Sequence, residues 1–118
     1  MAKVLGDFGD QLDLQMRQGS TFGPHECVIT NPDESAMDLS GCTIRASLRR
    51  NPGATEVVLF TVSVTDTAAG AFTFGLAKEA TIGLVPPKYI WDMELQDAAG
   101  RVLPICRGEV LVELEVTR

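Results

Sequence analysis

The stretch that decides the fold reads, from residue 87 to residue 97, Pro87-Lys88-Tyr89-Ile90-Trp91-Asp92-Met93-Glu94-Leu95-Gln96-Asp97. Large apolar side chains occupy every second position from 89 to 95, and mostly polar side chains lie between them. Successive side chains of a strand point to opposite faces, so the pattern predicts a strand with one apolar face. The stretch also contains the only Trp and the only Tyr of the chain. Because aromatic rings bury large areas, we expect this strand to lie at the centre of the core.

Alternation of the same kind recurs on both sides of this stretch and predicts further strands. These are residues 12–17, 25–31, 42–49, 57–66, 71–76, 101–105 and 110–116. Residues 57–66 and 71–76 are rich in β-branched and Phe residues and stand a hairpin loop apart, so we expect them to pair. Residues 77–84 lack the alternation, and a single helical turn is expected there before Pro86-Pro87 ends it.

Seven or eight short strands without a long helix predict an all-β fold, an antiparallel β-sandwich. Tyr89 stands two residues before Trp91, as the corner tyrosine of immunoglobulin domains stands two residues before their second cysteine. We therefore expect an immunoglobulin-like sandwich of 7–8 strands, with residues 80–87 forming the corner. A jelly roll or a small barrel is the alternative.

The alternation also separates side chains expected inside the sandwich from side chains expected outside it. The expected core residues are Phe60, Phe72, Phe74, Tyr89, Trp91 and Leu114. Some apolar residues fall on faces that are otherwise polar, and exposed apolar side chains can mark an interface. The possible interface residues are Leu59, Ile90 and Leu111.

The 118 residues are enough for one domain with its own core. Residues 11–118 are predicted to form this single β-sandwich domain. Residues 1–10 show little periodicity, and we expect them to form a flexible N-terminal arm that docks on a partner. No basic segment followed by an apolar run begins the chain, and no apolar stretch approaches the ~20 residues of a membrane span. We therefore expect neither a signal peptide nor a membrane partner.

The charge of the chain argues against nucleic acid as a partner. Its formal net charge is -6 and its pI is about 4.6, and the ten Lys and Arg residues are scattered. Proteins that bind DNA, RNA or anionic lipid need clustered cations to neutralise phosphate. The three cysteines are widely spaced, as expected for reduced thiols rather than for a disulfide framework or a zinc site.

The residues with chemical potential do not assemble into a recognisable constellation. His25 and Cys27 share a strand face, but a nucleophile also needs an orienting group and an oxyanion site. The carboxylates of Asp92, Glu94, Glu113 and Glu115 fall on expected outer faces, and the glycines form no phosphate-binding motif. The sequence therefore predicts a protein that is not an enzyme, with no catalytic residue, no metal, no cofactor and no small-molecule substrate.

Several short motifs resemble those of small virion proteins of tailed bacteriophages. They are Gln18-Gly19-Ser20-Thr21-Phe22, residues 37–49 (MDLSGCTIRASLR), residues 89–95 (YIWDMEL), the turn from Asp97 to Gly100, and residues 108–118 (GEVLVELEVTR). The succession resembles the N-terminal β-sandwich domain of phage baseplate upper proteins. It covers residues 15–118 with gaps. The chain departs from the pattern at Pro86-Pro87-Lys88, which replaces a glycine before the Tyr, and at Ser40, which replaces Thr.

This resemblance implies a non-enzymatic structural protein of a tailed-phage particle, made in the bacterial host cytoplasm and located in the virion. It would assemble in the tail, baseplate or neck by docking on other virion proteins and on copies of itself. A capsid decoration (cement) protein is one alternative. A carbohydrate- or receptor-binding β-sandwich is another, although aromatic residues are only 6% of the chain and mostly alternate inward.

Overall fold

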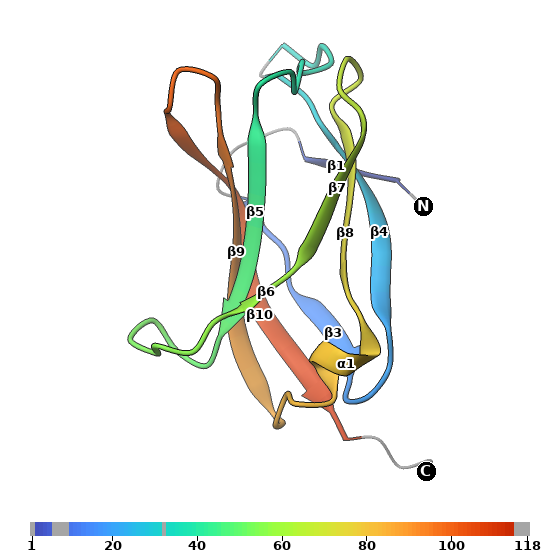
Figure 1. Ribbon diagram of the computed structural model, residues 1–118, viewed down its shortest axis with the longest axis vertical. Helices are drawn as coiled ribbons and strands as arrows, with labels where there is room; N and C mark the ends of the chain where they lie inside the picture. Colours follow the sequence, from blue (N-terminus) through green and yellow to red (C-terminus); the bar gives the residue numbers. More distant parts are fainter. Residues whose placement is uncertain (1, 6–9, 32, 115–118) are drawn as a thin grey trace.

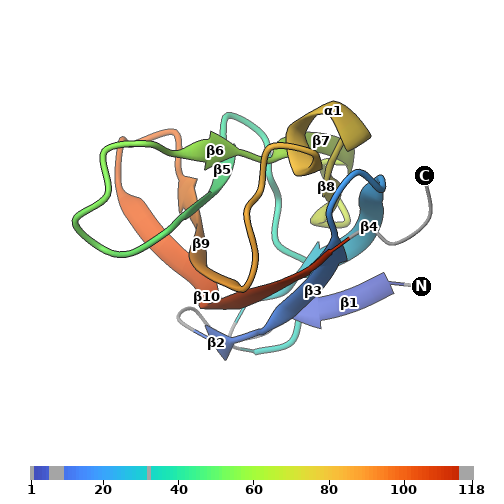
Figure 2. The same ribbon diagram turned by 90° about the horizontal axis from the view of Figure 1, so that it is seen from below.

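The protein is a β-sandwich of two sheets, seen in a computed structural model that describes residues 2–5, 10–31 and 33–114 (Figure 1). One sheet has the strand order β1-β4-β8-β7, and the other has the order β2-β10-β9-β5-β6, with β3 also pairing with β10. The strands are β1 (Ala2–Leu5), β2 (Asp10–Gln11), β3 (Leu14–Arg17), β4 (Phe22–Ile29), β5 (Thr43–Arg49), β6 (Val58–Leu59), β7 (Thr61–Asp66), β8 (Ala71–Leu76), β9 (Lys88–Gln96) and β10 (Val102–Glu113). Figure 2 shows the view along the sandwich, with β9 and β10 on one side and β4 and β8 on the other.

Strand β9 is the centre of the larger sheet, as its alternation predicts. It pairs antiparallel with β5 on one side and with β10 on the other. Trp91, Met93 and Leu95 are all buried, whereas Asp92 is exposed on the opposite face. The expected hairpin of β7 and β8 also forms.

The predicted all-β sandwich is therefore confirmed, although its pairing is not purely antiparallel. Strand β1 runs parallel to β4, and both β2 and β3 run parallel to β10. The orders β4-β8-β7 and β10-β9-β5 match the BED and GFC orders of immunoglobulin domains, whereas the parallel pairing of β1 with β4 departs from their antiparallel sheets.

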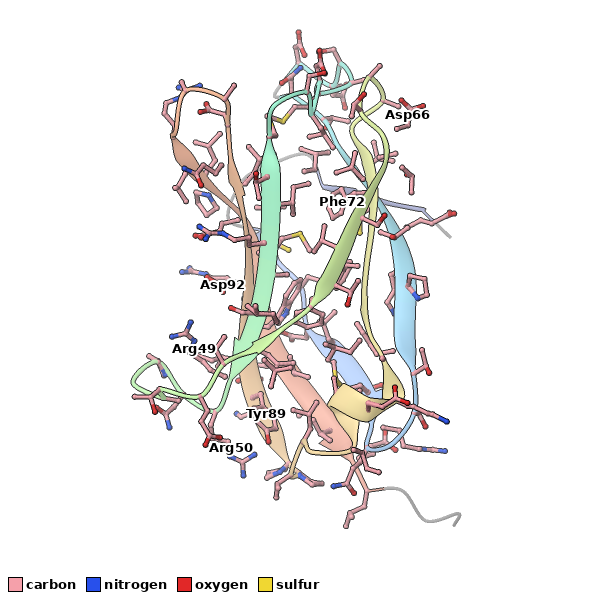
Figure 3. The ribbon with its side chains drawn as sticks, in the orientation of Figure 1. Arg49, Arg50, Asp66, Phe72, Tyr89 and Asp92 are labelled. Carbon is pink, nitrogen blue, oxygen red and sulfur yellow. The ribbon has the colours of Figure 1, made fainter. Side chains whose placement is uncertain are left out.

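The corner before β9 is held by Tyr89 and Arg50. The Tyr89 hydroxyl accepts a hydrogen bond from the Val85 N–H at 2.8 Å, the bond of a tyrosine corner. The Arg50 guanidinium lies 4.9 Å from the centre of the Tyr89 ring (Figure 3). It also donates hydrogen bonds to the carbonyls of Val85, Pro86 and Lys88. The single helical turn α1 (Lys78–Thr81) precedes this corner, as the sequence predicts.

The core between the sheets contains a cluster of aromatic rings. Trp91 of β9 stacks on Phe74 of β8, with ring centres 5.6 Å apart and planes 6° apart. Phe60 contacts both rings at 5.6–5.7 Å. Because β8 and β9 belong to different sheets, this stack joins the two layers. Aromatic pairs of this kind contribute about 0.5–1.5 kcal/mol beyond their buried area.

The residues expected in the core divide into three groups. Phe60, Phe72, Phe74 and Trp91 are buried, and Tyr89 is half-buried against the core. Leu114 was expected inside, but this prediction is wrong, because the residue is 63% exposed. Strand β10 ends at Glu113, which is its last residue paired with β3. Leu114 lies beyond the sheet, where alternation no longer sets the direction of a side chain.

The N-terminal residues differ in part from the expected arm. Residues 2–5 form β1 and pair with residues 26–29 of β4. An extended segment can satisfy its main chain by adding to a sheet edge whatever its side-chain pattern, which explains why periodicity gave no signal. Met1 and residues 6–9 of the predicted arm lie outside the described residues, and the arm's flexibility stays a prediction.

Replacing Trp91 by Ala is expected to lower the free energy of unfolding by about 3–5 kcal/mol, because it leaves a cavity between the sheets. The Trp91→Phe variant keeps a ring against Phe74 and should lose less. Urea denaturation followed by circular dichroism measures both changes. A Trp91→Ala protein as stable as the wild type would contradict this account of the core.

Replacing Gly108 by Ala is expected to cost roughly 2–3 kcal/mol or more, because its Cβ would overlap the Leu12 carbonyl, a main-chain group that cannot rotate away. Gly83 is the matched control. A Cβ there meets nothing within 4 Å, so Gly83→Ala should change stability by less than about 0.5 kcal/mol. If thermal denaturation showed equal losses of stability for the two variants, the close approach of the Leu12 carbonyl to Gly108 would not be what requires glycine at position 108.

Candidate functional site

The candidate site is the outer face of the larger sheet, built by side chains that alternate with the core residues. Strand register places five of them in one row across the sheet: Leu59, Ser47, Asp92, Arg107 and Gln11. These residues come from β6, β5, β9, β10 and β2. Segments far apart in the sequence thus form one continuous surface, which we call the outer face.

Ion pairs neutralise much of the charge on the outer face. Arg45 and Glu94, on neighbouring strands, approach to 3.2 Å, and Lys88 and Glu109 approach to 3.1 Å. These side chains are between about one third and two thirds exposed. Exposed pairs of this kind contribute only ~0.2–1 kcal/mol. They therefore shape the electrostatics of the face more than they stabilise the fold.

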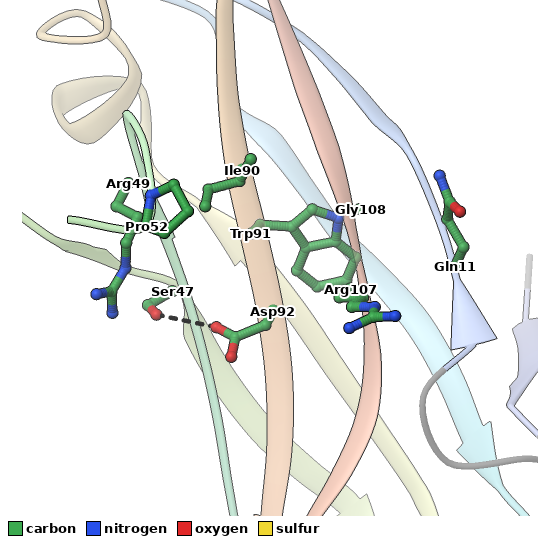
Figure 4. Close-up of a pocket in the computed structure, with 9 residues that line it drawn as sticks. All are labelled: Gln11, Ser47, Arg49, Pro52, Ile90, Trp91, Asp92, Arg107 and Gly108. Atoms are coloured by element: carbon green, nitrogen blue, oxygen red, sulfur yellow. Dashed lines mark hydrogen bonds between the residues drawn. The ribbon is translucent and has the colours of Figure 1, made fainter. Parts of the chain in front are cut away.

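A shallow cavity of about 490 Å³ lies within the outer face (Figure 4). It is lined by Gln11, Ser47, Arg49, Pro52, Ile90, Trp91, Asp92, Arg107 and Gly108. The Ser47 hydroxyl donates a long hydrogen bond of 3.5 Å to the Asp92 carboxylate. Within the described residues, the guanidinium groups of Arg49 and Arg107 have no hydrogen-bond or ion-pair partner.

The cavity is therefore suited to polar contacts with another molecule. Two guanidinium groups can each bind a carboxylate through two parallel hydrogen bonds, and Asp92 supplies an acceptor between them. The sequence did not identify this cavity, because its residues come from four strands and the loop after β5. Only the register of those strands brings them together.

The three possible interface residues all lie on the outer face. Leu59 is 70% exposed and Leu111 is 42% exposed, while Ile90 is half-buried and borders the cavity. Ile90 lies between Arg49 and Glu109 in the strand register. The face thus presents separate apolar side chains among charged ones, a composition compatible with a protein-binding surface.

His25 and Cys27, the two residues considered for nucleophilic chemistry, line the same cavity, one separate from the cavity of the outer face. The His25 ring packs edge-on against Phe22, with centres 4.5 Å apart. The Cys27 thiol is 3.9 Å from the His25 main-chain carbonyl. Burial, followed by the nearby carboxylates of Asp97 and Asp38, raises the pKa of the Cys42 thiol. A raised pKa lowers the fraction of reactive thiolate.

Two further findings concern the described residues only. No group of three or more His, Cys, Asp or Glu side chains among them is arranged to hold a metal ion. No helix formed by them is long and apolar enough to cross a membrane.

The fold and the outer face define a small β-sandwich domain, and comparison with solved structures finds a similar fold in a domain of a phage protein. The chain is similar to the N-terminal domain of phage TP901-1 ORF48, with a TM-score of 0.55 and 14% sequence identity. The match covers 96% of this chain and 99% of that domain. The resemblance drawn from the sequence motifs is thus confirmed at the level of the fold.

A second similar structure is the internalin-like protein lmo2027 of Listeria monocytogenes. Its TM-score is 0.42 at 16% identity, and the match covers 96% of this chain but 30% of that protein. This similarity is too low to support an argument about function. No protein-family model and no curated protein sequence matches the chain.

The substitutions Arg49→Ala and Arg107→Ala are each expected to change the free energy of unfolding by less than about 0.5 kcal/mol. Neither guanidinium has a partner within the described residues, so its removal leaves no buried group unsatisfied. Chemical denaturation measures the effect. A loss above about 1 kcal/mol for either variant would show that the fold, rather than binding, requires that arginine.

Proposed function

We propose that the protein is a structural component of a tailed bacteriophage particle, docking on other virion proteins in the tail, baseplate or neck. The observation that carries the proposal is the mutual coverage of 96% and 99% with the N-terminal domain of phage TP901-1 ORF48. The two domains correspond over nearly their whole length and not in a shared fragment. The motif resemblance to baseplate upper proteins supports the same conclusion independently of the coordinates.

In this proposal the sandwich is a rigid body and the outer face is its docking surface. A partner would cover Leu59 and Leu111, which are 70% and 42% exposed on this face. Fully burying a leucine contributes about 1.5–3 kcal/mol. Carboxylates of the partner would pair with Arg49 and Arg107 in the cavity and fix its orientation, because a bidentate pair constrains geometry as well as distance.

The sugar-binding alternative receives less support from the aromatic residues. Stacking on a sugar ring requires an exposed aromatic face, but Phe22, Phe60, Phe72, Phe74 and Trp91 are buried. The rings of Phe22, Phe60, Phe74 and Trp91 contact one another in the core. The observations therefore favour protein docking.

The double variant Leu59→Ser/Leu111→Ser is expected to enter particles at least tenfold less than the wild type, because two apolar contacts are lost. The measurement is quantitative mass spectrometry of purified particles from a phage that lacks the gene, complemented with each variant. Ile82→Ser is the control. Ile82 is 54% exposed but lies after α1, away from the outer face.

Two results would contradict the proposal at different levels. Absence of the wild-type protein from purified particles would refute the virion role itself. Normal incorporation of the double variant, with the wild-type protein present in particles, would instead show that a different face docks.

A further inference from the structure

The free edge of strand β7 lies outside the proposed docking surface on the outer face. Strand β7 is the last strand of the β1-β4-β8-β7 sheet, and among the described strands it pairs only with β8 (Figure 1). It has six residues, whereas the other outer strands of the two sheets have two or four. At such an edge, alternate residues direct their N–H and C=O groups outward, where another strand can bind them.

This edge lacks most of the features that usually prevent pairing between molecules. Natural edge strands are protected by lysine, by proline or by shortness, and Thr61 to Thr65 contains neither residue type. The Asp66 carboxylate at its end accepts a hydrogen bond from the Ala69 N–H, and so belongs to the turn. The one protective feature is a bulge between Val64 and Asp66. It falls at Thr65, the last residue of the strip, and Thr61 to Val64 pair regularly with β8.

The sequence of this edge is self-complementary. Residues 61–65 read Thr-Val-Ser-Val-Thr, the same in both directions. If two copies lie antiparallel about a two-fold axis at Ser63, each Thr61 faces a Thr65, each Val62 faces a Val64, and the two Ser63 residues face each other. Pairs of β-branched and of hydroxyl side chains are favourable across antiparallel strands.

We propose that two copies of this chain associate through their β7 edges, about a two-fold axis at Ser63. The contact is isologous and closed, since the same strip serves both copies, and it joins the two smaller sheets into one continuous sheet. The inference does not depend on the virion role. The proposed partner is a second copy, because a palindromic strip is complementary to itself. Nothing in this strip favours an unrelated strand.

Burial and charge are consistent with this partner. Val64 is 39% exposed and Val62 is partly buried, although both side chains belong to the inner side of the sheet. A second strand would cover both. The strip from Thr61 to Thr65 carries no charge, so two chains with a net charge of -6 each can meet there without placing like charges opposite each other.

The size of the contact sets its strength. Stable complexes bury about 800 Å² per partner, and a ladder of about five residues buries less. The dimer is therefore weak and depends on protein concentration. A cross-link that captures the paired state tests it better than a measurement at low concentration.

The decisive variant is Ser63→Cys in a Cys42→Ser background, which removes the one natural cysteine that is not buried. The two-fold axis places the two introduced thiols on directly opposite residues. Their Cα atoms are then about 4.5–5.5 Å apart, within the ~4.4–6.8 Å that a disulfide requires. Under mild oxidation at about millimolar protein, we expect a covalent dimer to form at least tenfold faster than in either control.

The two controls test the strand and the register. Thr73→Cys changes the residue opposite Ser63 on β8; its copies are about 14 Å apart across three strand spacings. Thr61→Cys lies on β7 itself; its two copies are displaced by four residues, or about 13 Å along the strands. Neither should cross-link efficiently in the proposed dimer.

A further variant tests the pairing without a cross-link. Ser63→Lys places two like charges opposite each other, and Ser63 is exposed, so the fold should persist. Analytical ultracentrifugation should show dimer for the wild type at millimolar concentration and monomer for this variant. Oxidation of Ser63→Cys no faster than that of Thr73→Cys would overturn the proposal. Preferential cross-linking of Thr61→Cys would overturn the axis at Ser63.

Discussion

The hydrogen bond from the Trp91 indole to the Leu12 carbonyl, 2.7 Å long, is the contact on which the arrangement of the sandwich depends. Trp91 stacks its face on Phe74 of the opposite sheet and uses its edge to hold the N-terminal segment. One side chain therefore joins both layers and the first strands of the larger sheet. The indole N–H is satisfied inside the protein, which removes the cost of burying it.

The surrounding main chain is adapted to the same contact. Leu12 lies between β2 and β3, where the N-terminal segment passes along β10, and its N–H donates to the Arg107 carbonyl at 2.8 Å. The Asp13 carboxylate accepts the Glu109 N–H at 3.0 Å, in place of a regular ladder bond. Gly108 has no side chain, and only this allows the Leu12 carbonyl to approach β10. The glycine, the aspartate and the tryptophan thus act as one unit.

The sequence predicted those strands in which every second side chain is apolar and buried. Strands β5, β8 and β9 were predicted nearly to their ends, because a slip of one residue would turn their apolar side chains outward. The corner tyrosine was also predicted, from its spacing to Trp91. Parallel pairing of β2 and β3 with β10 was not predicted, because alternation has the same period in parallel and antiparallel strands. Leu114 was misplaced because alternation does not show where a sheet ends.

The cavity in the outer face could not be predicted from the sequence, for a related reason. Ser47, Asp92 and Arg107 are separated by up to 60 positions, and they become neighbours only through the registers of β5, β9 and β10. The same cavity is lined by Trp91 and Gly108, the residues that fix the N-terminal segment. The surface available for docking is therefore coupled to the contact that holds the sandwich together. A side chain at position 108 would displace Leu12 and, with it, strand β2. Because β2 carries Gln11 at the margin of the cavity, the cavity would change shape as well. Both the fold and the shape of the outer face therefore require glycine at position 108.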